Sequence, residues 1–488
     1  MVKPKYKFQL YKHLQMSIPQ IYAEARKAAD DLGIPAHLRG RIGLSRTLAG
    51  CPSPLRNDIA EAITKGNSQA IPLAKIVDEI REMVKAGYGD DWDAAPVNTC
   101  EAALWLCMDT LFTPPHLGRG DSYRACYILP YEKQLHHHGA YGRPFPPRYK
   151  DLFADRGTTA GEQGLQGKRL TNLDMVIVPL AGADYPVHGI KQHPVPFLTE
   201  VDPEEAIEQI ALAAEVHGPH LSGFASLGYD TPGYGYNLKD EQGAAVLQKR
   251  IGEVAAEYGV PYLINNTAGM PFIGTDPRKV QADLIICAME AVGAMNTGLI
   301  IGRESTMVTI RRALGMHSDR WGTTASFGKA GYDFVLPSKA ALLAQAQALR
   351  MLHERPESVT GPVDQLEAIV QQEFAKLPPS LRQDIEISKS YNRGLIEINY
   401  EKTWKKASCG LPVFTVEDMY AGTNILQTGL AQMGIIPASA CEGNIEIAPG
   451  LGTVDEQGQL LEEPMRYGVQ ALVQLIEIIA RHSQLLPQ

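Results

Sequence analysis

Polar residues follow two short apolar runs in the middle of the chain. Asn265 and Asn266 come directly after the run 261–264, and Glu290 closely follows the run 284–286. Both runs have the length and the flanking residues of buried parallel strands. Since open α/β sheets bind ligands at the carboxyl ends of their strands, side chains at these positions can contact a ligand. The stretch therefore predicts the floor of a binding site.

A second candidate is a helix start near residue 98. Asn98 or Thr99 suits the N-cap position, and the apolar run behind Cys100 predicts a buried helix. The free N–H groups and the hydroxyl of such a helix start form a natural binding site for phosphate. A capped core helix without a ligand accounts for the same residues, so the pattern leaves both interpretations open.

Three consecutive histidines, at 136–138, are the obvious candidates for metal binding. Neighbouring residues of a strand point to opposite faces, and no Asp, Glu or Cys lies at a spacing that would complete a zinc site. We therefore expect no metal, and favour a ring that stacks on an aromatic ligand or a polar loop. The stretch 141–170, rich in Gly, Arg and Pro, predicts a long loop of the kind that covers binding sites.

The composition argues against several classes of protein. The chain has 488 residues, 44% of them hydrophobic, and a net charge of −9, so it offers no basic field for nucleic acid. No apolar run reaches the roughly 20 residues of a membrane helix, and no apolar segment follows the basic start, so no signal peptide is expected. Seven scattered cysteines without a CxxC pair indicate reduced thiols. We expect a cytoplasmic protein without membrane or nucleic-acid partners.

The elements that would position these candidates alternate along the chain. Strand and helix patterns succeed each other through 174–301, which predicts a doubly wound, mostly parallel α/β sheet. The patterns predict an N-terminal helical arm at 1–95, a large α/β domain at 96–345 and a small α+β domain at 346–488. Residues 311–331 are predicted to form a loop.

The order and spacing of four segments resemble the fold-type I enzymes that depend on pyridoxal 5′-phosphate (PLP). The resemblance extends over the large domain in arrangement, and it rests on the spacing of the segments together. They are Asn98-Thr99-Cys100-Glu101-Ala, the three histidines, Val260-Pro-Tyr-Leu-Ile-Asn265-Asn266-Thr-Ala-Gly and Asp283-Leu-Ile-Ile-Cys-Ala-Met-Glu290-Ala291. Within the family, the Asn-Asn-Thr-Ala-Gly run is most similar to the selenocysteine-synthase-like branch, which also has Asn where most relatives have Asp.

This resemblance implies PLP as the cofactor and assigns roles to individual residues. The segment that begins at Asn98 corresponds to the loop that holds the cofactor phosphate, and His136–His138 lie near the position where the family has a residue that stacks on the pyridine ring, so His136 or a neighbour is expected to stack there. Asn265 corresponds to the residue that pairs with the ring nitrogen. The residues expected to contact the cofactor are Asn98, Thr99, Cys100, His136, Asn265 and Ala288.

The resemblance also implies a substrate and an assembly. Ala291, beside Glu290, occupies the position of the lysine that forms the Schiff base, and Lys329 is the best alternative amine. An arginine is expected to bind the carboxylate of an amino-acid substrate through two parallel hydrogen bonds. The candidates are Arg143, Arg393 and Arg466. By analogy with the family, we expect a homodimer or a higher homo-oligomer.

Two positions depart from the family pattern. Asn265 replaces the Asp that keeps the pyridine nitrogen protonated, and a neutral amide leaves the ring less electron-poor. Ala291 replaces the lysine, so this position supplies neither an amine nor a base. Three interpretations are open: a Lys-to-Ala variant that traps a bound intermediate, a natural enzyme that uses another base, and a non-catalytic protein of the same fold.

The resemblance predicts a PLP-dependent lyase or transferase. Such an enzyme acts on an amino acid through an external aldimine, by elimination or replacement at the β-carbon or by related chemistry at Cα. Sulfur transfer from cysteine is an alternative, because Cys409 lies on a loop flanked by Gly and Pro, about where cysteine desulfurases carry their reactive cysteine. A binding or scaffold protein is the non-enzymatic alternative.

Overall fold

The computed structural model divides the chain into two compact units. The four-stranded unit comprises residues 1–56, 135–145 and 355–488, and the seven-stranded unit comprises residues 57–134 and 146–354. The residues that the structure describes are 16–45, 55–112, 126–130, 191–195, part of 207–215, 221–231, 238–266, 269–315, 335–400, 402–403, 411, 425–441 and 444–487.

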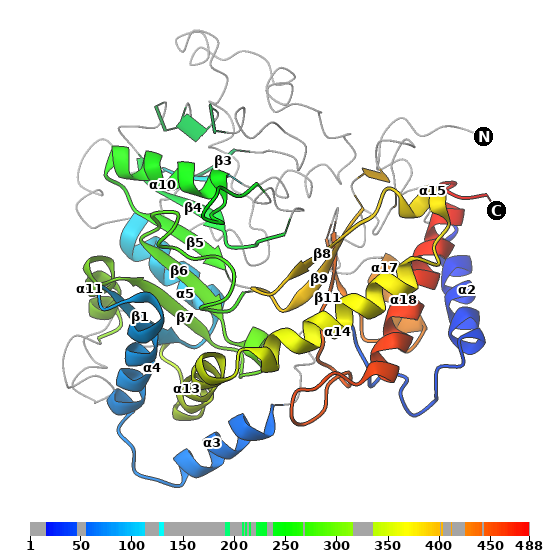
Figure 1. Ribbon diagram of the computed structural model, residues 1–488, viewed down its shortest axis with the longest axis horizontal. Helices are drawn as coiled ribbons and strands as arrows, with labels where there is room; N and C mark the ends of the chain where they lie inside the picture. The colour runs from blue at the N-terminus through cyan, green and yellow to red at the C-terminus, as the bar shows by residue number, and fades with distance from the viewer. Residues whose placement is uncertain are drawn as a thin grey trace. The chain divides into compact units, whose positions relative to one another are not determined.

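A mixed sheet forms the centre of the seven-stranded unit (Figure 1). Its strand order is β1-β7-β6-β5-β4-β2-β3. β7 is antiparallel to both of its neighbours, and all other pairs are parallel. The strands are β1 (Trp92–Val97), β2 (Cys126–Pro130), β3 (Lys191–Val195), β4 (Leu221–Leu227), β5 (Tyr262–Asn266), β6 (Leu284–Ala288) and β7 (Gly298–Arg303).

Helices pack around this sheet (Figure 1). Strands β4, β5 and β6 are buried along their whole length, as expected of parallel strands covered on both faces. Glycines in the strands let two of these helices pack close to the sheet. Gly223 in β4 leaves room for Phe112, and Gly302 in β7 leaves room for Met307. The helices are α3 (Asn57–Asn67), α4 (Leu73–Tyr88), α5 (Cys100–Cys107), η2 (Met108–Phe112), α10 (Val246–Tyr258), η5 (Glu290–Val292), α11 (Glu304–Ala313) and α13 (Lys339–Glu354).

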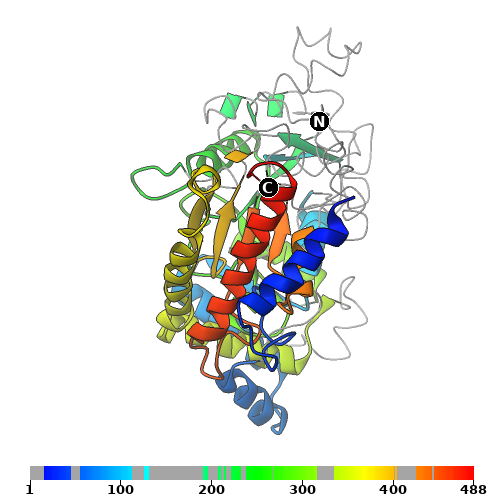
Figure 2. The ribbon, with the colours of Figure 1, turned by 90° about the vertical axis from the view of Figure 1, so that its right-hand side faces the viewer.

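The four-stranded unit is an α+β structure with an antiparallel sheet of order β10-β11-β9-β8. Figure 2 shows its last helix, in red, beside its first helix, in blue. Apolar residues of these helices and of β9 and β11 form one core. The elements are α2 (Ile18–Asp31), α14 (Glu357–Phe374), α15 (Pro379–Arg382), β8 (Glu386–Ser390), β9 (Leu395–Asn399), α17 (Ile425–Gln432), β10 (Ser439–Cys441), β11 (Asn444–Ile447) and α18 (Glu462–His482).

The predicted α/β fold is confirmed, one local prediction is corrected, and one strand was not predicted. The predicted loop 311–331 is wrong at its start, because residues 311–313 belong to α11, a helix in which Met307 and Ile310 are buried; residues 316–331 lie outside the described part of the chain. Residues 92–97, which were not predicted as a strand, form β1 at the edge of the sheet. The predicted arm 1–95 is divided between the two units at residue 56, and the predicted domain boundaries stay predictions.

Within the part of the chain that the structure describes, no helix is long and apolar enough to span a bilayer.

Candidate functional site

Helix α5 begins where the sequence predicted a phosphate-binding helix start. Thr99 is its N-cap residue, with extended backbone, and its Oγ1 accepts a hydrogen bond of 3.0 Å from the amide of Ala102. The amide of Asn98 donates to the carbonyl oxygen of Val335 at 2.8 Å. Because Thr99 Oγ1 accepts this bond, its own proton stays available as a donor. The amide of Ala103 donates to the carbonyl oxygen of Thr99 at 3.1 Å, so the features of this helix start that favour an anion are the Thr99 hydroxyl proton and the helix dipole.

Gly298, the first residue of β7, lies against this helix start. A Cβ at residue 298 would lie 2.5 Å from the carbonyl oxygen of Thr99 and 3.0 Å from the amide nitrogen of Cys100. The Sγ of Cys100 lies 3.4 Å from the carbonyl oxygen of Cys287, in β6. The first turn of α5 therefore rests directly on β6 and β7.

The register of the sheet decides which side chains share the face on which α5 begins. Gly298 is the partner of Ala288, and Ile286 is the partner of Asn265. Residues in register, and residues two apart in one strand, point to the same face. Asn265 and Ala288 therefore project to the face on which Gly298 meets Thr99. Asn265 is 1% exposed, so its side chain is a buried polar group at the carboxyl end of β5.

Asn266 projects to the opposite face. Its Nδ2 donates to the Sγ of Cys287 at 3.8 Å, and its Oδ1 has no hydrogen-bond partner among the described residues. Gly228 packs against it so closely that a Cβ there would lie 2.5 Å from the Cβ of Asn266. Burial raises the pKa of the Cys287 thiol to about 12, although the hydrogen bond from Asn266 acts in the opposite direction. The two adjacent asparagines thus belong to different environments.

A short turn follows β6 and carries residue 291. The amide of Ala288 donates to the carbonyl oxygen of Gly269 at 2.8 Å, and the amide of Met289 donates to the carbonyl oxygen of Thr297 at 3.1 Å. The turn then forms η5, and Gly293 ends it with a φ of +77°. Glu290 and Ala291 therefore lie at the carboxyl end of β6, the strand next to the one that ends in Asn265.

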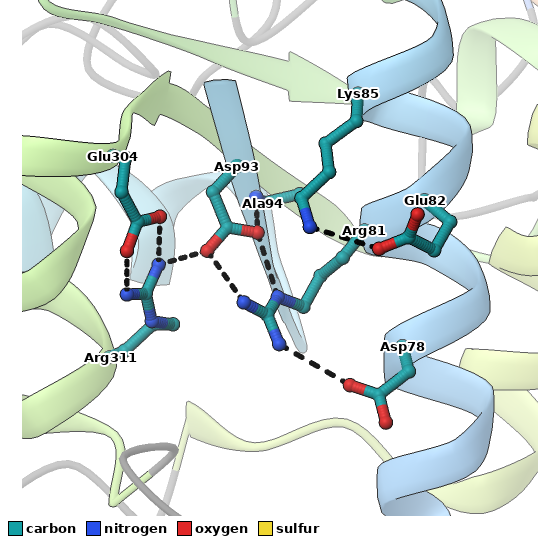
Figure 3. Close-up of polar contacts among 8 residues, drawn as sticks. All are labelled: Asp78, Arg81, Glu82, Lys85, Asp93, Ala94, Glu304 and Arg311. Atoms are coloured by element: carbon teal, nitrogen blue, oxygen red, sulfur yellow. Dashed lines mark hydrogen bonds and ion pairs between the residues drawn. The ribbon is translucent and has the colours of Figure 1, made fainter. Parts of the chain in front are cut away.

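A buried carboxylate anchors β1 to the helices beside it (Figure 3). The Asp93 side chain is fully buried, and its oxygens accept hydrogen bonds from Arg81 Nε at 2.7 Å, from Arg81 Nη2 at 3.0 Å and from the amide of Ala94 at 2.8 Å. Arg311 of α11 also forms an ion pair with Asp93, and its guanidinium contacts Glu304. Burial raises the pKa of Asp93, but the hydrogen bonds and the two positive charges outweigh it, and the pKa lies below its usual value.

The remaining predicted site residues are not brought together by the described contacts. Arg393 is buried in the four-stranded unit and forms ion pairs with Glu397 and Glu446. Arg466, in α18, has Nη1 2.9 Å from Glu373 and Nη2 2.8 Å from Glu462. The other predicted residues lie outside the described part of the chain: His136, Arg143, Lys329 and Cys409.

A cavity of about 700 Å³ lies at the opposite end of the central strands. Pro261 and Asp283, beside the amino ends of β5 and β6, line it together with Arg303 at the end of β7. Burial raises the pKa of Asp283 despite a hydrogen bond from the amide of Tyr262 and the charge of Arg303. The described residues of the predicted site are not among those that line this cavity, so the two features are separate.

Sequence reasoning missed the role of Gly298. The residue is ordinary in the sequence, in the run Asn296-Thr297-Gly298-Leu299, and glycine before an apolar strand is common. Only the contact with the backbone of Thr99 and Cys100 distinguishes it. A small residue at the start of a predicted buried strand was the available signal, because such positions can admit the close approach of another backbone.

Comparisons with family models and with curated proteins gave no match. Among solved structures, one from the directed evolution of transaminases by ancestral reconstruction is 13% identical, with a TM-score of 0.52, over 92% of this chain and 88% of that chain. The complex of SepCysS with the N-terminal domain of SepCysE is 14% identical, with a TM-score of 0.49, over 91% and 97%. Pyridoxamine-pyruvate aminotransferase from Mesorhizobium loti is 13% identical, with a TM-score of 0.47, over 92% and 94%. The likeness to the transaminase shows that this chain has the α/β fold expected from its resemblance to fold-type I enzymes.

Proposed function

We propose that this protein binds PLP and acts on an amino acid, as a lyase or transferase that eliminates or replaces a group at the β-carbon. One observation carries the proposal: Asn265 and Ala288 share the face of the sheet on which the capped start of α5 meets Gly298. The helix start predicted to bind phosphate and a buried polar side chain thus share one face of a fold similar to that of a transaminase. The sequence resemblance to fold-type I enzymes adds the identity of the cofactor.

The residues present fit noncovalent binding of PLP. Thr99 and the start of α5 would hold the phosphate, through the hydroxyl proton of Thr99 and the favourable dipole of the helix start. Asn265 would contact the pyridine nitrogen from the end of β5. Gly298 leaves room for the first turn of α5, since a Cβ at residue 298 would collide with the backbone of Thr99 and Cys100. Residue 291 is alanine and cannot hold the cofactor covalently.

When bound, PLP supplies an electron sink for a bond that breaks at the substrate's Cα. Asn265 places a neutral amide at the ring nitrogen, so no carboxylate there holds a proton on the ring. Ala291 leaves the carboxyl end of β6 without an amine, and we propose that Lys329 moves the proton instead. In this proposal, one of Arg143, Arg393 and Arg466 binds the substrate carboxylate. The active form is a homodimer or a higher homo-oligomer in the cytoplasm.

The substitution Ala291→Lys, followed by addition of PLP, tests this function. A lysine at the carboxyl end of β6 is expected to bind PLP covalently, with visible absorbance that borohydride reduction removes and a cofactor adduct on residue 291 by mass spectrometry. The matched control is Asn296→Lys, which places a lysine on an exposed position between β6 and β7. The control is expected to acquire no adduct at residue 296 at equal PLP concentration.

Two further outcomes separate the alternatives. If neither the unsubstituted protein nor Ala291→Lys binds PLP, by equilibrium dialysis and by absorbance, the proposal is wrong. If the unsubstituted protein converts amino acids at an ordinary enzymatic rate, it is not a variant that traps an intermediate. Binding without turnover in either form identifies a non-catalytic protein of this fold.

A further inference from the structure

The loop that follows β5 links the strand ends of the candidate site. The amide of Gly269 donates to the carbonyl oxygen of Asn266 at 2.9 Å, and the carbonyl oxygen of Gly269 accepts from the amide of Ala288 at 2.8 Å. Farther along the loop, Thr275 Oγ1 donates to the carbonyl oxygen of Gly228 at 2.8 Å. These bonds tie together the carboxyl ends of β4, β5 and β6.

Phe272, in the middle of this loop, has a backbone conformation that is unfavourable for its residue type. Its φ is +67°, in the left-handed region. A bulky residue stays there only where its surroundings impose the conformation. The other described non-glycine residues with positive φ, Gln281 and Gln484, are exposed, whereas Phe272 is half-buried. The contacts of Phe272 therefore have to account for this conformation.

The Phe272 ring occupies a slot between α4 and α13. Its centroid lies 4.4 Å from the ring of His353 and 5.2 Å from that of Tyr88. The Phe272 amide donates to the Tyr88 hydroxyl at 2.9 Å. A Cβ on Gly87 would lie 2.4 Å from the Phe272 ring. One wall is itself fixed, because His353 Nε2 lies 2.9 Å from the carbonyl oxygen of Met83.

We propose that Phe272 is a positioning residue for the cofactor site, an inference that rests on the proposed function. The ring is held in the slot, and this fixes the path of the loop between β5 and β6. The fixed path keeps the carbonyl oxygen of Gly269 within reach of the Ala288 amide. The ends of the two strands, with Asn265 on one and the turn to residue 291 on the other, are thereby held in one arrangement. Phe272 itself touches neither cofactor nor substrate in this role.

Two substitutions remove this contact by different routes. Phe272→Gly removes the ring and relieves the backbone strain, so a loss of stability from strain cannot explain its effect. Gly87→Ala leaves the loop sequence intact and places a methyl group where the ring lies. Phe272→Leu keeps a shorter apolar side chain and serves as the conservative variant. Gln281→Gly is the matched control, because it removes a positive-φ residue from an exposed position outside the slot.

The first measurement is amide hydrogen exchange of the peptide that contains Ala288, on the protein without cofactor. In Phe272→Gly and Gly87→Ala, exchange at Ala288 is expected to accelerate roughly tenfold or more, while peptides of α10, in the same unit, keep their rates. Phe272→Leu is expected to retain most of the protection, and Gln281→Gly all of it. A purely global loss of stability would accelerate both regions of the chain alike.

The second measurement is the affinity for PLP by equilibrium dialysis. The two slot variants are expected to bind PLP roughly tenfold more weakly or worse, and Gln281→Gly as the unsubstituted protein does. Unchanged exchange at Ala288 in both slot variants overturns the inference, as does faster exchange with unchanged PLP affinity. If no form binds PLP, the proposed function fails, and with it the cofactor role of Phe272, while the exchange rates still report whether Phe272 holds the loop.

Discussion

Gly298 lies so close to Thr99 that a Cβ at residue 298 would be 2.5 Å from the Thr99 carbonyl oxygen. The neighbouring amide nitrogen of Cys100 would be 3.0 Å away. Both atoms belong to the backbone, so no flexible side chain can yield to an added methyl group. The absence of a side chain at residue 298 is what lets α5 begin on the face of the sheet that carries Asn265.

The substitution Gly298→Ala is therefore expected to displace the first turn of α5. The free energy of unfolding should fall by about 1–3 kcal/mol, the usual cost of overpacking a well-packed site. The affinity for PLP should fall roughly tenfold or more, because the phosphate donors move with the turn. Chemical denaturation and equilibrium dialysis measure the two effects. Gly361→Ala in α14 is the control, because the added Cβ would have no atom within 4 Å apart from its chain neighbours and the backbone of its own helix, and the expected change is below about 1 kcal/mol. Unaltered PLP binding in Gly298→Ala would show that α5 does not hold the phosphate.

The two adjacent asparagines should respond differently to the same substitution. Asn265→Asp buries a carboxylate, which lowers the melting temperature without PLP. Bound PLP should recover much of this loss, because a carboxylate facing the ring nitrogen stabilises its protonated form. Asn266→Asp places the same charge on the opposite face, beside Cys287, where PLP should recover nothing. Melting temperatures of both variants with and without PLP measure this recovery. Equal recovery in the two variants would refute the proposal that Asn265 contacts the ring nitrogen.

The buried carboxylate of Asp93 should contribute stability that depends on pH. Its pKa is lowered in the folded protein, so its contribution is present above the unfolded-state pKa of about 4 and is lost as the pH falls through the lower, folded-state pKa. Asp93→Asn leaves Arg81 and Arg311 without their shared counter-charge and should cost roughly 3–5 kcal/mol at neutral pH. The difference between the two proteins should shrink in acid.

Asp78→Asn is the matched control for this prediction. Asp78 forms an ion pair of 3.3 Å with the same Arg81, but its side chain is 65% exposed. Exposed pairs contribute less than about 1 kcal/mol, so denaturation curves of this variant should follow those of the unsubstituted protein closely. Comparable losses in the two variants would mean that burial of Asp93 is not the source of its effect.

The cysteines around the candidate site should be unreactive in the folded protein. Cys100, Cys107 and Cys287 are buried, and burial raises the pKa of Cys287 to about 12. The thiolate is the nucleophile, so a maleimide or disulfide reagent at pH 8 should modify these residues only after unfolding. Peptide mapping by mass spectrometry identifies the modified positions. Rapid labelling of Cys287 under native conditions would show that strand β6 opens to solvent.

Local patterns were sufficient to predict several elements that form the site. The apolar runs before Asn265 and Glu290 correspond to β5 and β6, and the capping residue Thr99 starts α5. These elements are signalled by residues adjacent in the sequence, through burial and capping. Strand β1 and helix α11 were missed, because Asp93 and Arg311 become neighbours only across the edge of the sheet. In its own segment, each of these two charged residues suggests a surface position rather than a buried one.

The sequence by itself determined the α/β fold, the polar residues at the strand ends and the absence of a lysine at residue 291. Only the tertiary structure decided which of these residues share a face. The register of β5, β6 and β7 places Asn265 with Ala288 and Gly298, and it places Asn266 on the opposite face. Pairing between strands that are distant in the sequence sets this register, and a shift by one residue would exchange the faces of the two asparagines. The slot around Phe272 likewise exists only after α4 and α13 have packed, because its walls come from separate helices.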